Sequence, residues 1–75
     1  MERNEAFAQV ADELQRALIK WKAFNSPHEG YAVIKEELEE LWGDIKANGA
    51  RGGKQQRKEA AQVAAMGLRY LIDLC

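Results

Sequence analysis

The sequence predicts an all-α fold, a three-helix, hairpin-like bundle that forms one domain over residues 1–75. Apolar residues recur at alternating steps of three and four, which is the spacing of one helix face. Turn-forming residues separate three such segments, and 47% of the 75 residues are hydrophobic, as is typical of a globular chain. We expect helices over about residues 4–24, 27–48 and 54–74.

The first two helices have clear boundary signals. The first apolar face consists of Phe7, Val10, Leu14, Ala17, Trp21 and Phe24. Pro27 ends this helix, because the residue before a proline avoids the helical conformation. Ser26 and Glu29 flank Pro27 in the pattern of a capping box with proline at the first helical position. Asn48-Gly49 is typical of a helix end.

The third helix is apolar on two sides. One side consists of Ala60, Val63, Gly67, Tyr70, Leu71 and Leu74, and the other of Ala61, Ala64, Ala65, Leu68 and Ile72. A helix that is apolar on two sides is buried on two sides. Since a three-helix chain covers only one of them, we expect homo-oligomerisation to complete the bundle.

Composition excludes several classes of function. The formal net charge of −1 gives no reason to expect general nucleic-acid binding. A single cysteine, Cys75, leaves no internal disulfide. No long uncharged apolar stretch is present, so we expect neither a membrane span nor a signal peptide. A cytoplasmic location is the expectation.

Acidic residues line one edge of the second helix. At about 100° per residue, Glu37, Glu40 and Asp44 form a stripe beside the apolar face centred on Ile34. Glu36 lies further round and Glu39 nearly opposite. The third helix carries a similar polar pair, Glu59 and Gln62, beside its own apolar face. If the two helices pack antiparallel, these pairs can converge.

Converging carboxylates repel one another, and a cation removes that repulsion. Mg²⁺ and Mn²⁺ prefer oxygen ligands, and Mg²⁺ keeps several waters and usually bridges to substrate phosphates. The chemistry indicated is metal-assisted attack of water on a phosphoanhydride. The competing interpretation is a solvated acidic face, which is the usual role of such a run on a helix.

Ile34-Lys35-Glu36-Glu37-Leu38-Glu39-Glu40-Leu41 resembles the EExxE-L motif of the MazG-like, all-α nucleoside triphosphate pyrophosphohydrolases. Glu59-Ala-Ala-Gln62 stands where that family has ExxD. The stretches at residues 28–31 and 62–70 are similar to those of short MazG-like proteins of phages and prophages. The resemblance covers about residues 24–75.

The resemblance implies Mg²⁺-dependent cleavage of a nucleoside triphosphate to the monophosphate and pyrophosphate, in a dimer or tetramer. By position, Glu37, Glu40 and Glu59 would be metal ligands, and Glu36 a supporting acid that orients water or a ligand. Gln62 replaces the fourth acid of the motif. Its amide oxygen can coordinate Mg²⁺ without adding charge, and Asp44 could compensate.

Basic residues around the glycine-rich loop are candidates for phosphate contacts: Arg51, Lys54, Arg57 and Lys58, with Arg69 further along the third helix. The alternatives are that the first four keep a loop hydrated and that Arg69 pairs with Asp73 four residues on.

Three other residues could belong to a site but have simpler roles. Trp21 and Trp42 could stack on a base, but their apolar spacing favours core or interface packing. His28 is expected at the surface. An alternative function is therefore a non-catalytic module for oligomerisation or for nucleotide or protein binding.

Overall fold

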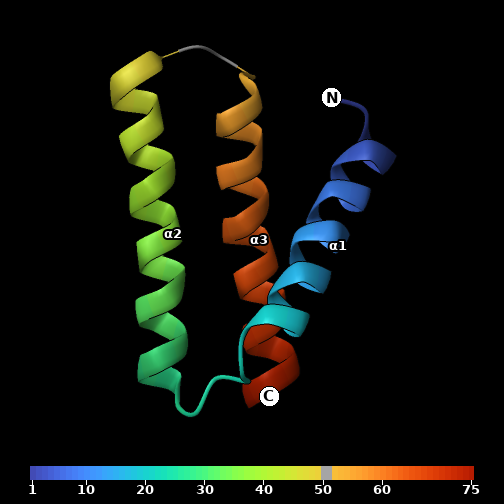
Figure 1. The fold of residues 1–75 in the computed structure, drawn as a ribbon, viewed down its shortest axis with the longest axis vertical. Helices are drawn as coiled ribbons and strands as arrows, with labels where there is room; N and C mark the ends of the chain where they lie inside the picture. Colours follow the sequence, from blue (N-terminus) through green and yellow to red (C-terminus); the bar gives the residue numbers. More distant parts are fainter. Residues whose placement is uncertain (50–51) are drawn as a thin grey trace.

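The computed structural model describes residues 1–49 and 52–75, in which all regular structure is helical. Helix α1 spans Arg3–Lys20, α2 spans Pro27–Asn48 and α3 spans Lys54–Leu74. Helices α2 and α3 form an antiparallel pair, and α1 lies against the other side of α3 (Figure 1). Within the described residues, α3 packs against both other helices, whereas α1 and α2 do not pack on each other. The predicted all-α fold is confirmed.

The boundary signals of α2 work as predicted. The Ser26 hydroxyl accepts a hydrogen bond from the Glu29 backbone N–H at 3.2 Å, and Pro27 occupies the first turn. In a capping box this glutamate would accept a hydrogen bond from the backbone N–H of Ser26. The Glu29 carboxylate instead accepts from the N–H of Asn25, one residue earlier in the chain, at 3.0 Å. At the other end, Gly49 has φ +62°, a left-handed conformation that glycine adopts without steric cost.

The first helix ends at Lys20, four residues before the predicted end. Trp21 is extended, with φ −120° and ψ 146°. The Arg69 guanidinium of α3 donates hydrogen bonds to the carbonyl oxygens of Ala17 and Trp21, the second at 2.7 Å. Asp73 accepts from the Phe24 N–H at 3.0 Å. The chain therefore leaves the helix because distant side chains bind its backbone groups.

Arg69 and Asp73 form the polar centre of this junction. The Arg69 Nε donates to Asp73 at 3.0 Å, which confirms the predicted pairing, and Arg69 is only 3% exposed. The Phe24 N–H and the guanidinium together hold the pKa of Asp73 below its usual value. Stability from this carboxylate is therefore present at neutral pH and is lost as pH falls through its lowered pKa.

The hydrophobic core is small and built largely from small side chains. Its buried members are Ala17, Ala65 and Met66, and partly buried apolar residues from α1, α2 and the α1–α2 connection surround them. Gly30 lets α2 approach α3 closely, because a Cβ there would lie 2.6 Å from Cδ2 of Tyr70. The core thus fixes how α2 and α3 face each other.

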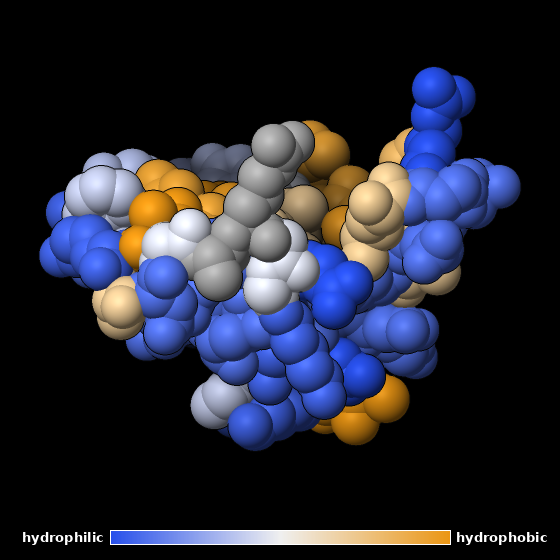
Figure 2. All heavy atoms as spheres, turned by 90° about the horizontal axis from the view of Figure 1, so that it is seen from above, coloured by the Kyte–Doolittle hydropathy of each residue, from blue (hydrophilic) through white to orange (hydrophobic). Residues whose placement is uncertain are grey.

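Both tryptophans lie largely outside this core. Trp21 is 62% exposed and Trp42 is 55% exposed, so neither packs in the core of this chain, and packing at an interface, the other role expected of them, stays a prediction. Three helices supply too little surface to cover every apolar stripe. Hydrophobic side chains consequently remain along one side of the bundle, as Figure 2 shows.

Two further expectations concern a phosphate contact by Arg51 and the absence of a membrane span. Arg51, one of the candidate phosphate contacts, lies outside the described residues. Among the described residues, no helix combines the length and the apolar character that a membrane crossing requires.

Replacing Arg69 by methionine is expected to lower the free energy of unfolding by about 3 kcal/mol or more. The change leaves the Asp73 carboxylate without its charged partner, the Trp21 carbonyl without its donor and the Ala17 carbonyl with the Trp21 N–H alone. Urea unfolding followed by circular dichroism measures the effect.

The control is Lys35→Met, because Lys35 forms only an exposed ion pair with Glu39 at 4.0 Å. That variant is expected to change stability by less than about 1 kcal/mol. Equal effects of the two substitutions would contradict the role assigned to Arg69.

Candidate metal centre

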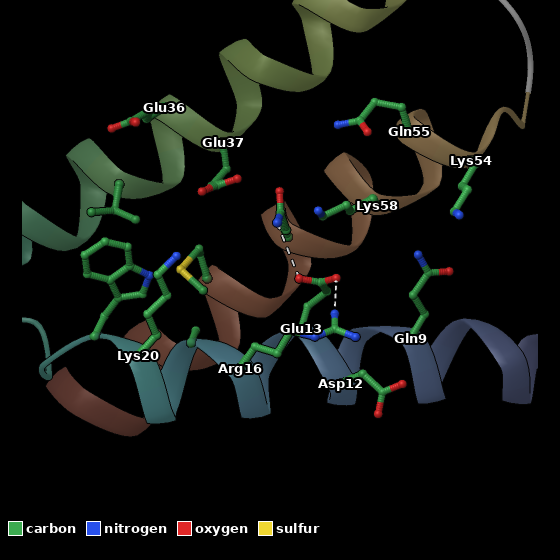
Figure 3. A pocket seen from close by; sticks show the side chains of 15 residues that line it. Gln9, Asp12, Glu13, Arg16, Lys20, Glu36, Glu37, Lys54, Gln55 and Lys58 are labelled. Carbon is green, nitrogen blue, oxygen red and sulfur yellow. Dashed lines mark hydrogen bonds and ion pairs between the residues drawn. The ribbon is translucent and has the colours of Figure 1, made fainter.

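A groove of about 910 Å³ runs between α1 and α2, with α3 as its floor. Figure 3 shows side chains from all three helices pointing into it. Its lining is charged over α2 and the first turns of α3, and becomes apolar near Trp21, Val33 and Met66. A groove of this size accommodates a small organic ligand.

Three carboxylates converge beside this groove. Glu37 and Glu40 of α2 and Glu59 of α3 each offer an oxygen, and these oxygens all lie within 4.8 Å of one another. We call these three residues the acidic cluster. Glu59 is only 9% exposed, Glu37 is half-buried and Glu40 is exposed, so the cluster extends from the interior to the surface. The predicted convergence of the two polar pairs is thus present.

Gln62 contacts the cluster through its amide, which fits the site in either of two orientations. With its nitrogen inward, the amide donates to Glu37 at 3.1 Å and to Glu59 at 3.2 Å. With its oxygen inward, it faces the same two carboxylates, and Nε2 lies 3.4 Å from an oxygen of Glu13. The first orientation suits a cluster without a cation, and the second would add a fourth oxygen ligand.

Crowding of the carboxylates changes the acidity of Glu37. Partial burial, and then the neighbouring charges of Glu40, Glu59 and Glu36 together with a hydrogen bond between the Glu37 and Glu40 carboxyl groups, raise the pKa of Glu37 to about 7. Its carboxyl therefore holds a proton over much of the mildly acidic range. A cation would compete with that proton.

The remaining acidic residues of α2 are outside the cluster. Glu36 is exposed and lines the groove, and its role as a supporting acid stays a prediction. Asp44, expected to compensate for Gln62, instead accepts a hydrogen bond from Asn48 at 2.8 Å. Glu39 pairs with Lys35 on the outer surface.

The basic residues predicted to contact phosphate divide into two groups. Lys54 and Lys58 line the groove (Figure 3). Arg57 instead borders a separate small hollow between α1 and α3, and Arg69 is buried with its hydrogen bonds committed to α1 and Asp73. Arg57 and Arg69 therefore lie away from Lys54 and Lys58, and a phosphate contact by either of them stays a prediction.

The groove wall on α1 was missed by the sequence analysis. Glu13 is buried, and its carboxylate pairs with Arg16 at 2.6 Å, which one of the dashed lines of Figure 3 marks. Asp12, Arg16 and Lys20 line the same wall. Their helical spacing is a signal that the projection used for the other helices could have found.

Comparisons with family models, with curated proteins and with solved structures give no match to this chain. The resemblance to the MazG-like enzymes therefore rests on the quoted motif residues.

Without a divalent cation, Glu37 is expected to make the protein less stable as pH rises from about 4.5 to about 7. In this interval the unfolded carboxyl has lost its proton while the folded one retains it, so the unfolded state binds fewer protons. Below this interval Glu37 is neutral in both states, and above it Glu37 is charged in both. Urea unfolding at a series of pH values, for the wild type and for Glu37→Gln, isolates this contribution as the difference between the two curves. A difference that is constant with pH would contradict the assigned pKa.

Proposed function

We propose that this protein is a Mg²⁺-dependent nucleoside triphosphate pyrophosphohydrolase of the MazG-like kind. The observation that carries the proposal is the convergence of Glu37, Glu40 and Glu59 beside a groove with lysines on its rim. This is the arrangement that the motif residues lead one to expect for that activity. A cytoplasmic location, a phage or prophage origin and self-association belong to the same proposal.

The residues present suit Mg²⁺ or Mn²⁺. Three carboxylates supply hard oxygen ligands with enough negative charge to favour a divalent cation. Gln62 supplies a fourth oxygen when its amide turns, and Glu13 then accepts the freed amide N–H. A bound Mg²⁺ would neutralise phosphate charge and make phosphorus more electrophilic.

The groove offers charged side chains that suit the phosphates of a nucleotide and apolar side chains that suit its base. Lys58 and Lys54 of α3 carry ammonium groups that can bind phosphate oxygens. At the apolar end, the exposed Trp21 ring and the Met66 side chain offer surfaces on which a base can stack. The Lys20 ammonium lies over the Trp21 ring, 5.1 Å from its centre, within the range of a cation–π interaction.

The proposed reaction is a single displacement at the α-phosphorus. A water oxygen forms the new bond to phosphorus, and the bond from phosphorus to the bridging oxygen of the β-phosphate breaks. Pyrophosphate leaves with the electron pair of that bond. Glu36, which is exposed and lines the groove, would orient the water and accept its proton.

A specific observation favours a second candidate, a non-catalytic binding module. With the Gln62 nitrogen inward, its two hydrogen bonds hold Glu37 and Glu59 together without any cation. In that case the groove would bind a ligand without turning it over. Metal binding and turnover therefore have to be measured separately.

Incubation with a panel of canonical and modified nucleoside and deoxynucleoside triphosphates plus Mg²⁺ is expected to release pyrophosphate. Glu37→Gln should reduce the rate at least about 100-fold, because it removes one charged ligand and its contribution to the transition state. The control is Glu39→Gln, since Glu39 lies on the outer surface. No release from any triphosphate at high protein concentration would exclude the enzyme, and a retained rate in Glu37→Gln would exclude the site.

Gln62→Glu is expected to tighten Mg²⁺ binding about tenfold, because affinity for hard cations rises with the charge of the ligands. Without Mg²⁺ the same variant should melt at a lower temperature than the wild type, since a fourth carboxylate joins the cluster. Calorimetric Mg²⁺ titration and thermal melting measure the two effects.

Gln15→Glu on the exposed side of α1 adds the same charge away from the groove and is the control. If the cluster binds no cation, Mg²⁺ will raise the melting temperature of neither variant. That result, with pyrophosphate release absent, would favour the binding module.

A further inference from the structure

Glu13 on α1 is a buried carboxylate outside the motif residues of the second and third helices. It is 7% exposed and lines the groove (Figure 3). Burying a carboxylate costs free energy unless its oxygens have hydrogen-bond partners. Oε1 of Glu13 accepts from Arg16 at 2.6 Å, and Oε2 lies 3.4 Å from Nε2 of Gln62. Glu13 therefore connects the α1 wall of the groove with the amide that borders the acidic cluster.

The two partners of Glu13 have different roles. Arg16 lies three residues further along the same helix, and it supplies the opposite charge that a buried carboxylate needs. The Arg16 side chain is 68% exposed, so this ion pair reaches the solvent. Gln62 belongs to α3 and lies 49 residues away in the sequence. Because Arg16 pairs with Glu13 within α1, the Gln62 amide can gain or lose its contact with Glu13 without leaving that charge unpaired.

The side-chain amide of Gln62 lies between Glu13 and the acidic cluster. Its nitrogen only donates and its oxygen only accepts, so turning the amide exchanges what each side receives. With the nitrogen toward the cluster, the amide donates to Glu37 at 3.1 Å and to Glu59 at 3.2 Å. The amide oxygen then takes the place of Nε2, 3.4 Å from Oε2 of Glu13, and two acceptors face each other. Glu13 therefore disfavours this orientation and favours the one with the oxygen toward the cluster.

Glu59 keeps an amide partner when Gln62 turns. Nε2 of Gln55, one helical turn before Glu59 on α3, donates to the Glu59 carboxylate at 2.5 Å. This contact does not involve Gln62, so Glu59 still has a donor once the Gln62 nitrogen faces Glu13. The contacts with Glu13 and Gln55 thus lower the free-energy cost of directing the Gln62 oxygen toward a cation.

We propose that Glu13 is a positioning residue for Mg²⁺: by accepting the Gln62 N–H, it holds the amide oxygen toward the acidic cluster and raises the cation affinity without touching the cation. The inference rests on the proposed function, because it concerns the cation that the acidic cluster would bind. It adds a determinant of affinity on α1, where the motif residues place none. Hydrogen-bond partners that orient the ligands of a metal commonly set its affinity in this way.

Calorimetric Mg²⁺ titration of Glu13→Gln tests the proposal. The substitution keeps the shape of the side chain but lets it donate to the Gln62 oxygen, so the orientation with the nitrogen toward the cluster is no longer disfavoured. The dissociation constant for Mg²⁺ is expected to rise about tenfold or more. The control is Asp12→Asn, which removes the same charge from the same wall at an exposed position and is expected to change the constant less than about threefold.

Gln62→Met separates orientation of the amide from the charge of Glu13. This substitution removes the amide, so adding Glu13→Gln to it is expected to change the Mg²⁺ dissociation constant less than about threefold. Equal weakening by Glu13→Gln and Asp12→Asn, or a tenfold effect of Glu13→Gln that persists in Gln62→Met, would overturn the inference, because only charge would then matter.

A measurement on the wild type keeps the test decisive if Glu13→Gln fails to fold. Nuclear Overhauser contacts of the Gln62 side-chain amide protons are expected with Glu13 at saturating Mg²⁺, and contacts that remain with Glu37 and Glu59 would overturn the inference. A wild type that binds no Mg²⁺ would overturn it together with the proposed metal site. Mg²⁺ binding with equal constants for the wild type and Glu13→Gln would overturn the inference alone.

Discussion

The close packing of α2 against α3 is the constraint on which the site depends. Gly30 allows that approach, and the approach brings the oxygens of Glu37, Glu40 and Glu59 within 4.8 Å of one another. Like charges at this separation repel, so the folded chain must neutralise some of them. A proton on Glu37, the amide nitrogen of Gln62 and a divalent cation are three ways of doing so. Under the proposed function, the cation would relieve this repulsion directly.

Helix α3 carries the polar contacts that position both neighbours. Near its C-terminal end, Arg69 and Asp73 bind the backbone of α1 and of the connection after it. Near its N-terminal end, Glu59 and Gln62 meet the carboxylates of α2. Because the groove lies between α1 and α2, which do not pack on each other among the described residues, its width is set by their separate contacts with α3. The core of mostly small side chains leaves much apolar surface exposed on the single chain.

Much of this arrangement could be predicted from the sequence, because the relevant signals are local. Ser26, Pro27 and Gly49 mark helix boundaries through their own backbone preferences, and the projection of Glu37 and Glu59 needs only helical spacing and antiparallel packing. The end of α1 could not be predicted, since it depends on Arg69, about fifty residues away in the chain. The exposure of Trp42 also depends on how much surface three helices can cover. Glu13 was not predicted, because only the second and third helices were projected for polar residues. The remaining wall of the groove comes from α1.

The central claim is that a cation replaces the proton and the amide as the neutralising group of the acidic cluster. Nuclear magnetic resonance of side-chain carboxyl carbons during a Mg²⁺ titration at neutral pH tests it most directly. The account predicts that the signals of Glu37, Glu40 and Glu59 shift along one saturable curve, and that the pKa of Glu37 falls well below about 7 once Mg²⁺ is bound. Signals that do not shift, or that shift together with exposed carboxylates such as Glu39 and without saturation, would contradict it.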